Sequence, residues 1–139
     1  MMYLLDTNVI SELRKRERAN PGVLNFIQQA EDDQTNVFLS VVTIGELRRG
    51  VELIRHRGDT AQADALNTWL EQLLDQYADY ILEFGLDQAQ LWGRLRVPHY
   101  ENALDKQIAA TALLYDLTLV TRNVDDFSAT GVKLLNPFT

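Results

Sequence analysis

The chain has 139 residues, of which 46% are hydrophobic, and this is enough to fill one core in a single domain spanning residues 1–139. It contains no cysteine, which excludes disulfide and zinc–thiolate chemistry. It has no apolar run of the roughly 18 residues that a membrane span requires and no secretory signal, which predicts a cytoplasmic protein without membrane contact. A net charge of −7 is unusual for a nucleic-acid-binding protein, although the basic residues are clustered in Arg14-Lys15-Arg16 with Arg18, Arg48-Arg49 and Arg55-His56-Arg57.

The first half of the chain predicts two buried strands, each followed by helices. Residues 2–5 form a short apolar run that ends at an acid, and residues 37–42 are rich in β-branched and apolar side chains. Asn20-Pro21 is typical of a helix start, because Asn caps helix N-termini and Pro suits the first helical position. We predict helices over residues 9–14, from Pro21 to Ala30, and from Thr43 as N-cap toward Arg57 with Ile44, Leu47, Val51 and Ile54 inside.

The second half of the chain repeats this alternation after a break at Gly58-Asp59. Helices are predicted over 63–74, over 86–95 and from Asn102 onward, the first with the stripe Ala63, Leu66, Trp69, Leu70, Leu73 and Leu74, the last with Leu104, Ile108, Ala112 and Tyr115. Strands are predicted over 80–84, 117–121 and 132–135. Strands that alternate with helices indicate an α/β fold, a three-layer α/β/α domain with a central parallel sheet of four to five strands.

Polar residues stand where the predicted strands end. In open parallel sheets, ligands bind beyond the carboxyl ends of the strands. Asp6, Thr7 and Asn8 follow the first strand, Glu46 lies in the helix after the second, and Thr121 and Asn123 follow the fourth, with Asp105 in the helix before it. Clustered acids raise one another's pKa, and a hard cation such as Mg²⁺ resolves the conflict. The pattern indicates metal-assisted phosphodiester hydrolysis without choosing the substrate.

Each of these residues also has a purely structural interpretation. Asp6 could cap the helix that follows it, and Asn123 could be an ordinary turn residue. Thr43-x-x-Glu46 has the spacing of a capping box, and Asn102-x-x-Asp105 has the same spacing. These separate roles do not explain why all four residues fall at one edge of the sheet.

Four segments resemble a known family. Leu4-Leu5-Asp6-Thr7-Asn8-Val9-Ile10-Ser11, residues 43–50, residues 104–112 and residues 119–127 resemble, in the same order, the motifs of PIN-domain proteins, and of VapC and FitB-like toxins in particular. The closing Asn136-Pro137-Phe138 is also FitB-like. Together the segments cover essentially the whole chain.

The resemblance implies a Mg²⁺-dependent endoribonuclease (Mn²⁺ being an alternative), the toxin of a toxin–antitoxin pair. It implies that Asp6 and Asp105 bind the metal most directly and that Glu46 orients the attacking water or completes the shell. Asn123 falls where some relatives carry a fourth acid, and the implied supporting residues are Thr7, Asn8 and Thr121. Asp125 and Asp126 are interpreted as surface-turn residues.

The family also implies partners. These are an RNA substrate, a second copy in a homodimer, and a VapB/FitA-like antitoxin whose C-terminal segment enters the active-site groove, often with an Arg near the acids. DNA would be contacted only through the antitoxin. One alternative stays open, a catalytically silent PIN-fold protein that acts by binding antitoxin or RNA, because Asn123 lowers the charge of the site. A dehalogenase-like phosphatase would need an acid where this chain has Asn8, and a nucleotide-binding module would need a Gly-rich phosphate loop.

Overall fold

Five short strands form one parallel sheet in a computed structural model, which describes residues 2–139. The strands are Tyr3–Leu5 (β1), Val37–Ser40 (β2), Ile81–Leu82 (β3), Thr118–Val120 (β4) and Lys133–Leu135 (β5). Their order is β3-β2-β1-β4-β5, and every neighbouring pair is parallel. The predicted parallel sheet is therefore confirmed, with β1 at its centre.

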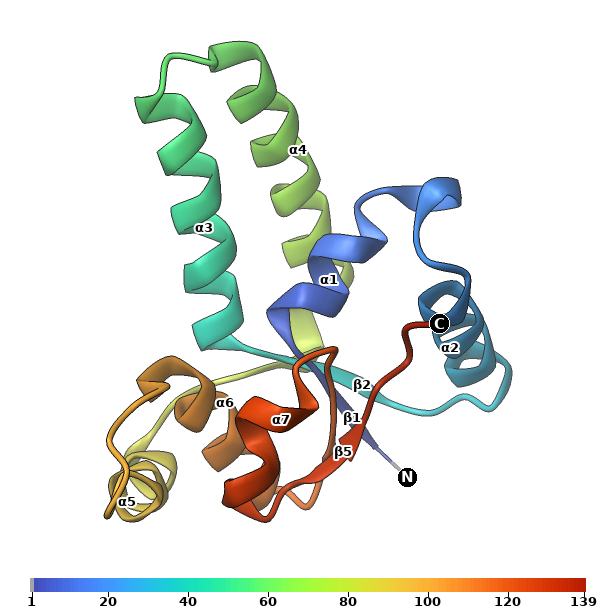
Figure 1. The fold of residues 1–139 in the computed structure, drawn as a ribbon. Helices are drawn as coiled ribbons and strands as arrows, with labels where there is room; N and C mark the ends of the chain where they lie inside the picture. The colour runs from blue at the N-terminus through green and yellow to red at the C-terminus, as the bar shows by residue number, and fades with distance from the viewer. Residues whose placement is uncertain (1) are drawn as a thin grey trace.

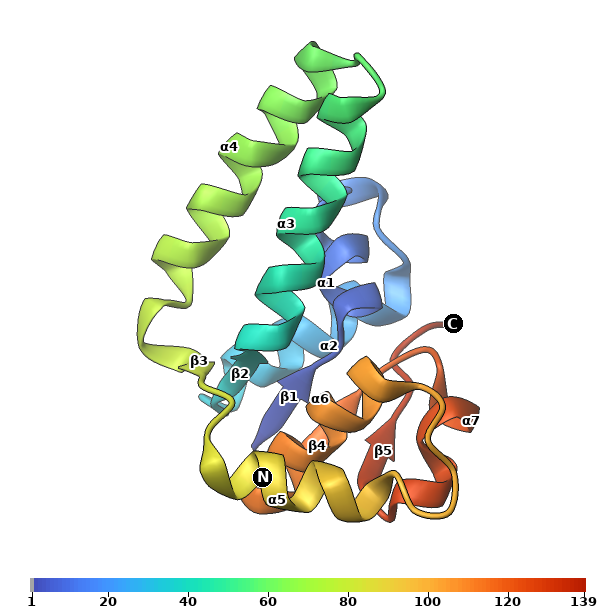
Figure 2. The same cartoon turned by 90° about the vertical axis from the view of Figure 1, so that its left-hand side faces the viewer.

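Helices cover both faces of this sheet, which confirms the three-layer α/β/α architecture. They are Thr7–Leu13 (α1), Pro21–Asp32 (α2), Val41–His56 (α3), Thr60–Gln76 (α4), Leu86–Leu95 (α5), Ala103–Leu114 (α6) and Val124–Phe127 (α7), with 3₁₀ turns at Arg16–Arg18 (η1), Ala78–Tyr80 (η2) and Ser128–Thr130 (η3). Figure 1 shows α1 and α2 on one side of the sheet and α5, α6 and α7 on the other. The α3–α4 hairpin rises away from the sheet, as Figure 2 shows from a second direction.

The pleat of the strands divides the apolar side chains between two cores. Leu5, Leu39 and Val120 face the helices α1 to α4, where the buried residues include Val9, Ile10, Val23, Leu47, Val51, Leu70 and Leu73. Leu4 and Leu119, their neighbours in the strands, face α6 and α7 with Ile108, Ala109, Ala112 and Phe127. Neighbouring strand residues thus contact opposite helix layers, which explains why β1 and β4 carry consecutive buried apolar residues, Leu4-Leu5 and Leu119-Val120.

Two predicted boundaries between strand and helix are wrong. The second strand ends at Ser40 instead of residue 42, because the Ser40 hydroxyl accepts a hydrogen bond from the Val42 N–H and starts α3 there. Thr43 is therefore a buried residue inside the helix and not its N-cap. The third strand shrinks from 80–84 to Ile81–Leu82, since Tyr80 belongs to η2.

The predicted stripes differ in how well they match the cores. In α4, Leu70 and Leu73 are buried, while Trp69 and Leu74 are partly buried against the same core, so core packing is confirmed there. In α6 the stripe is wrong at both ends, because Leu104 is 50% and Tyr115 47% exposed. Ile108, Ala109 and Ala112 face the sheet instead, since two small alanines let the helix approach it closely.

The end of the chain returns to α2. Thr139 accepts and donates hydrogen bonds with the Asn20 side chain, which also caps α2 through the Gly22 N–H. A Cβ at Gly22 would lie 2.1 Å from the Pro137 carbonyl oxygen, so only glycine allows this approach. Among residues 2–139 there is no helix with the length and apolar character needed to cross a membrane.

Candidate active site

The carboxyl ends of β1 and β4 form the centre of the candidate site. The chain leaves β1 toward β2 on one side, and β4 lies on the other, so the crevice between them is the switch point of the sheet. Asp6 and Thr121 are the first residues beyond these two strands, and the Asp6 N–H still donates to the Val120 carbonyl at 2.9 Å. The prediction that Asp6 and Thr121 meet at one edge is thus confirmed in space.

Asp6 is buried and held by three donors. Its Oδ1 accepts from the Thr7 N–H at 2.8 Å, and its Oδ2 accepts from the Thr121 hydroxyl at 2.8 Å and from the Asn8 amide at 3.2 Å. The first of these bonds makes Asp6 the N-cap of α1. The capping role of Asp6 is confirmed, and it uses only one of the two carboxylate oxygens.

Asn8 joins this carboxylate to the loop after β4. Its Nδ2 donates to both Asp6 and the Thr121 hydroxyl, and its Oδ1 accepts from the Arg122 N–H at 3.1 Å. All polar atoms of the amide are used, and an Asp at this position would bring an acceptor where donors are required. Asn8, like Thr121, therefore orients Asp6, as a supporting residue of a metal site does.

Glu46 reaches the site from the second turn of α3. The Thr7 hydroxyl donates to its Oε1 at 2.9 Å. Glu46 makes no capping box with Thr43, because α3 is already capped by Ser40 and Thr43 lies inside the helix. The Glu46 carboxylate therefore has no capping role, and the hydrogen bond from Thr7 of α1 orients it.

Asp105 lies in the first turn of α6. Asn102 takes the N-cap position with a left-handed φ of 57° but makes no side-chain cap bond, so the pair forms no capping box. Asp105 lies in the first turn, where its charge can offset the helix dipole. No hydrogen bond of the described chain involves the Asp105 side chain. Burial, followed by the charges of Asp6, Asp126 and Glu46, raises the pKa of Asp105 to about 6.

The electrostatics of the site are those of uncompensated negative charge. Burial raises the pKa of Asp6, and the bonds from Thr121, Thr7 and Asn8 oppose this increase. Burial also raises the pKa of Glu46, with a further contribution from the charge of Asp6. The charged side chains that act on these three carboxylates are themselves negative, so the site carries negative charge that no basic side chain among them offsets.

Asp126 was assigned to a surface turn by the sequence, and the structure adds a role. It is exposed, as predicted, but its charge acts on both Asp6 and Asp105. The signal was the spacing Asn123-x-x-Asp126, which places both residues on one side of a helical turn once α7 is known to start there. Asp125, by contrast, contributes to none of these shifts.

Asn123 takes part in the site through its backbone. Its N–H donates to the Thr121 hydroxyl at 3.0 Å, while its exposed side chain makes no hydrogen bond within residues 2–139. It lines a shallow hollow of about 220 Å³ with Arg122, Asp125 and Asp126. The structure therefore brings Asp6, Glu46 and Asp105 together and leaves the Asn123 amide at the rim.

The donor set fits a hard divalent cation. The groups at its centre are the carboxylates of Asp6, Glu46 and Asp105, and carboxylate oxygens are ligands that Mg²⁺ prefers. Burial raises the pKa of all three, and the charges of neighbouring acids add to the rise. Within residues 2–139, no three acidic or histidine side chains approach closely enough to enclose an ion by themselves.

Lys106, the neighbour of Asp105, does not neutralise the acids. It is 7% exposed, and its Nζ donates to the His99 carbonyl oxygen in the connection between α5 and α6. Its charge therefore stabilises that connection, which leads into the first turn of α6.

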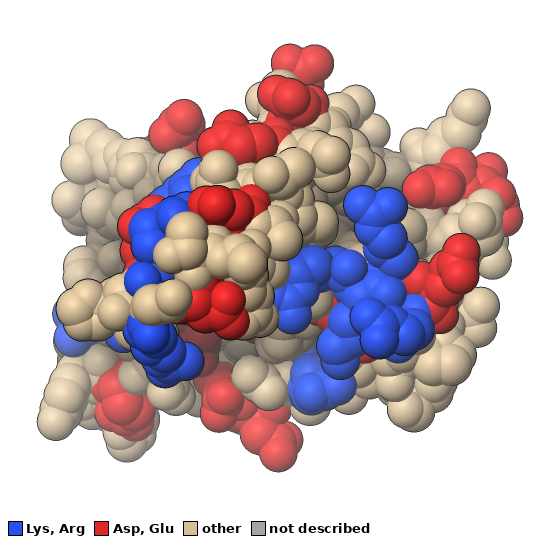
Figure 3. All heavy atoms as spheres, turned by 90° about the horizontal axis from the view of Figure 1, so that it is seen from above, with Lys and Arg blue, Asp and Glu red and all other residues tan. Residues whose placement is uncertain are grey.

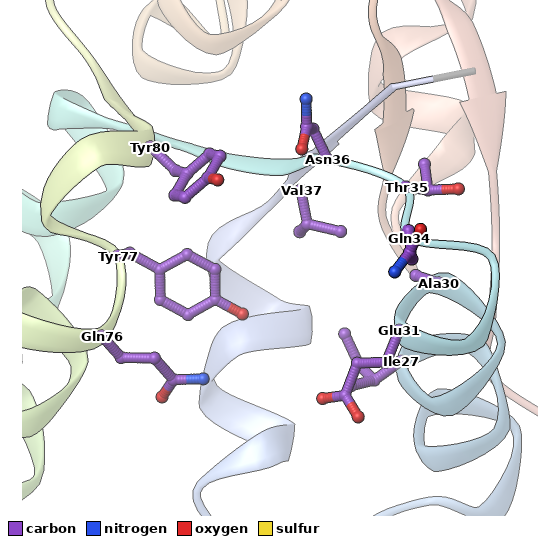
Figure 4. A pocket seen from close by; sticks show the side chains of 10 residues that line it. All are labelled: Ile27, Ala30, Glu31, Gln34, Thr35, Asn36, Val37, Gln76, Tyr77 and Tyr80. Carbon is purple, nitrogen blue, oxygen red and sulfur yellow. The ribbon is translucent and has the colours of Figure 1, made fainter.

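Another hollow, of about 300 Å³, lies near the start of β2 at the opposite end of the strands. Figure 4 shows Tyr77 and Tyr80 on one side of it and Glu31 and Ile27 of α2 on the other. Burial and the charge of Glu31 raise the pKa of Tyr77. It contains one carboxylate and lies away from the switch point, so it is not the candidate active site.

Comparison with known proteins identifies relatives of the whole chain. The sequence model of the PIN domain matches residues 3–133. The chain is 37% identical to toxin FitB of Neisseria gonorrhoeae over 145 residues, covering 99% of both chains. It is 32% identical to a VapC ribonuclease of Sinorhizobium fredii over 142 residues, covering 99% of this chain and 98% of that protein.

A solved structure extends the likeness to three dimensions. It is described as FitAB bound to a DNA fragment, and the matching chain is 33% identical with a TM-score of 0.80, covering 99% of this chain and 96% of that one. The similarity includes the strands and helices that carry Asp6, Glu46 and Asp105.

Proposed function

This chain belongs to the PIN domain family, and from that premise we propose that it is a Mg²⁺-dependent endoribonuclease, the toxin of a toxin–antitoxin pair. The observation that carries the proposal is that Asp6, Glu46 and Asp105 act on one another at the switch point, with no basic side chain among the charges that act on them. Relatives named as a toxin and as a VapC ribonuclease support the same activity.

In this proposal Asp6 and Asp105 would hold Mg²⁺ or Mn²⁺, with Glu46 completing the set. The ion, when bound, lowers the pKa of water and neutralises phosphate charge. Asp6 keeps one orientation because Thr7, Asn8 and Thr121 fix both of its oxygens. Glu46, held by the Thr7 hydroxyl, orients the attacking water and can accept its proton. The Asn123 amide at the rim adds no charge, which supports a site with few metal ions.

The test is cleavage of a mixed cellular RNA pool by the purified chain with EDTA, Mg²⁺ or Mn²⁺. Asp6→Asn is compared with Asp79→Asn, the same change at an exposed acid of η2. We expect metal-dependent cleavage that is lost in the first variant and kept in the second. Folded protein that cleaves no RNA with either metal would contradict the proposal and favour the catalytically silent alternative, with Asn123→Asp as the variant that should then restore activity.

We also propose an antitoxin of the VapB/FitA type as partner, with DNA contacted only through it. The support is a relative solved as FitAB on DNA and the uncompensated acids, which can accept an Arg of the antitoxin in place of the metal. Co-expression with the candidate antitoxin should yield a complex and suppress cleavage in the cytoplasm, where we place the protein. RNA cleavage at an undiminished rate by the antitoxin-bound protein would contradict this role.

A homodimer is the remaining part of the proposal. Val97, Tyr100 and Leu104 are 77%, 73% and 50% exposed in and beside the connection between α5 and α6, and exposed apolar side chains are candidates for a protein interface. Light scattering on the purified chain should give twice the mass of 15.9 kDa. Tyr100→Glu should shift it to the monomer, and an unchanged mass would place the interface elsewhere.

A further inference from the structure

The hollow of about 300 Å³ near the start of β2 has the make-up of a small-molecule site. Ligand pockets combine apolar walls with a few polar groups, and this volume lies at the lower end of their range. Ile27 and Ala30 of α2 and Val37 of β2 form the apolar part. Figure 4 shows Tyr77, the C-cap of α4, and Tyr80 of η2 on the opposite side. A ligand here would therefore contact two helices that are far apart in the sequence.

The hollow lies at the negative ends of these two helices. The last turn of α2 lines it through Glu31, and the last residue of α4, Gln76, lines it from the other side. A helix carries partial negative charge at its carboxyl end, and neither helix has a basic residue in its last turn to offset it. Figure 3 shows Lys and Arg gathered on the face toward which the α3–α4 hairpin rises in Figure 1, whereas no residue that lines the hollow is basic.

Glu31 adds a full negative charge to one wall. No ion pair within residues 2–139 involves its carboxylate. Figure 4 shows the Tyr77 hydroxyl pointing across the hollow toward the side of Glu31. Burial and then the charge of Glu31 raise the pKa of Tyr77, so the hydroxyl keeps its proton at neutral pH. A cation between these two side chains would be bound by a carboxylate on one side and a neutral hydroxyl oxygen on the other.

The rim of the hollow is built on an unusual turn. α2 ends with the Thr35 N–H donating to the Ala30 carbonyl at 2.9 Å and the Gln34 N–H donating to the Glu31 carbonyl at 3.0 Å, which is the pattern of a Schellman motif. Glycine is the usual residue in the left-handed position of this motif, where Gln34 has a φ of 53°. Gln34 instead brings a side-chain amide to the hollow, and Asn36 brings another. Their oxygens are further acceptors for N–H groups.

We propose that this hollow binds a primary alkylammonium group, with the ammonium between the Glu31 carboxylate and the Tyr77 hydroxyl. The three N–H donors of an ammonium group match the acceptors that line the hollow. The apolar stem packs on Ile27 and Val37, and the ring of Tyr80 offers a π face to the cation. An uncharged ligand of the same shape would gain only the apolar contacts. The inference goes beyond the proposed nuclease function and does not depend on it, since the hollow lies away from the switch point.

The first experiment titrates n-butylammonium chloride into ¹⁵N-labelled protein at constant ionic strength and follows the amide chemical shifts. A ligand of this size can reach a dissociation constant on the order of 1 mM. We expect saturable shifts centred on residues 30–37 and 76–80. 1-Butanol has the same stem without the charge and should bind at least about tenfold more weakly. Equal binding of 1-butanol, or saturable shifts centred elsewhere, would overturn the site.

The second experiment removes single groups from the wall. Glu31→Gln should weaken n-butylammonium binding about fivefold, the upper end of what exposed ion pairs contribute. Asp32→Asn is the matched control, because Asp32 is also at the end of α2 but accepts from Gln28 and does not line the hollow. It should change binding by less than about twofold. Tyr77→Phe keeps the ring and should weaken binding about two- to tenfold. Equal effects of Glu31→Gln and Asp32→Asn would overturn the assignment of Glu31.

Free amines and the lysine side chains of other proteins share this chemistry, so Nα-acetyl-lysine N-methylamide is the second probe. Tighter binding of n-butylammonium supports the site and identifies its ligand as a free amine. Tighter binding of the lysine derivative supports the site and identifies the ligand as a lysine of another chain. No saturable binding of either probe overturns it. Asp6→Asn, which removes the proposed cleavage, should bind both probes like the unmutated chain, so this inference and the proposed function fail separately.

Discussion

Two carboxylates of the same site are treated differently by the fold. Asp6, beyond the central strand, is 4% exposed and accepts hydrogen bonds from three residues. Asp105, in the first turn of α6, is partly exposed and accepts none within residues 2–139. Burial raises the pKa of both, but only at Asp6 do hydrogen bonds oppose the increase.

This difference shows which of the two carboxylates the protein stabilises with its own hydrogen-bond donors and which it does not. Asp6 would keep its place without any ligand, because the donors that hold it belong to α1 and to the end of β4. The ionised form of Asp105 is disfavoured by burial and by the charges of Asp6, Asp126 and Glu46, and no hydrogen bond within residues 2–139 opposes this. We therefore expect Asp6 to determine geometry and Asp105 to determine affinity for the cation.

The largest expected effect is that of Asp105→Asn. If Asp105 binds the metal as proposed, cleavage should fall at least about a hundredfold, because loss of a metal ligand has a larger effect than loss of a supporting residue. The folded protein should nevertheless be more stable at pH 7 without metal, by about 1 kcal/mol after allowance for solvent screening. Urea unfolding and RNA cleavage on the same preparation test both statements, with Asp79→Asn as control. Lower stability would show that Asp105 is held by the protein after all.

Next is Thr121→Val, which removes the hydroxyl at the centre of the Asp6 network. That hydroxyl donates to Asp6 and accepts from Asn8 and from the Asn123 N–H. We expect a loss of about 1–3 kcal/mol in unfolding free energy, because buried partners are left unpaired, and a ten- to a hundredfold loss in cleavage at about saturating metal. Thr121→Ser keeps the hydroxyl and should retain most of both. Equal losses of stability and cleavage in Thr121→Val and Thr121→Ser would show that the effect comes from packing and not from the hydroxyl.

The pH dependence of stability sharpens the comparison further. The pKa of Asp105 rises from 3.8 to about 6 on folding, so between these values the folded chain binds more protons than the unfolded chain. Its contribution to stability is therefore lost as pH increases from about 4 to 6. In EDTA, the unmutated protein should lose about 1 kcal/mol across this range relative to Asp105→Asn. Mg²⁺ at pH 7 should restore it, and a parallel response of the two proteins would contradict the assignment.

The smallest expected effect is that of Thr7→Val, which removes the donor to Glu46. The pKa of Glu46 should rise further, and the pH at which cleavage reaches half its maximum should rise with it. We expect a loss of activity of only about tenfold, because Glu46 keeps its helix and its charge. Thr7→Ser is the matched control. If Thr7→Val cleaves normally, Glu46 does not depend on Thr7 for its orientation.

The sheet and the meeting of Asp6 with Thr121 could be predicted because both follow from local patterns. Short apolar runs such as residues 2–5 define buried parallel strands, and parallel strands bring their carboxyl ends to one edge. The boundary at Ser40 could not be predicted in this way. Ser40 and Thr43 are both good caps, and the choice depended on how α3 packs against α1 and α4.

The remaining errors arose from contacts between distant segments. The outward positions of Leu104 and Tyr115 reflect the close approach of Ala109 and Ala112 to the sheet, which a pattern of large residues does not reveal. The influence of Asp126 on Asp6 depends on a helical turn after β4 that is only four residues long. The interpretation of Thr43-x-x-Glu46 as a capping box was wrong because the helix was predicted to start at Thr43, whereas α3 is capped by Ser40.

The bond between Asp6 and Thr121 also has a consequence in time. These residues are 115 positions apart, and the strands that carry them are direct neighbours in the sheet. During synthesis at about 5–20 residues per second, roughly 6–23 seconds pass between their appearance. A nascent chain that already contains Asp6, Glu46 and Asp105 still lacks the partner that orients Asp6. The hydrogen bonds that orient Asp6 are therefore incomplete until the segment that carries Thr121 has been synthesised.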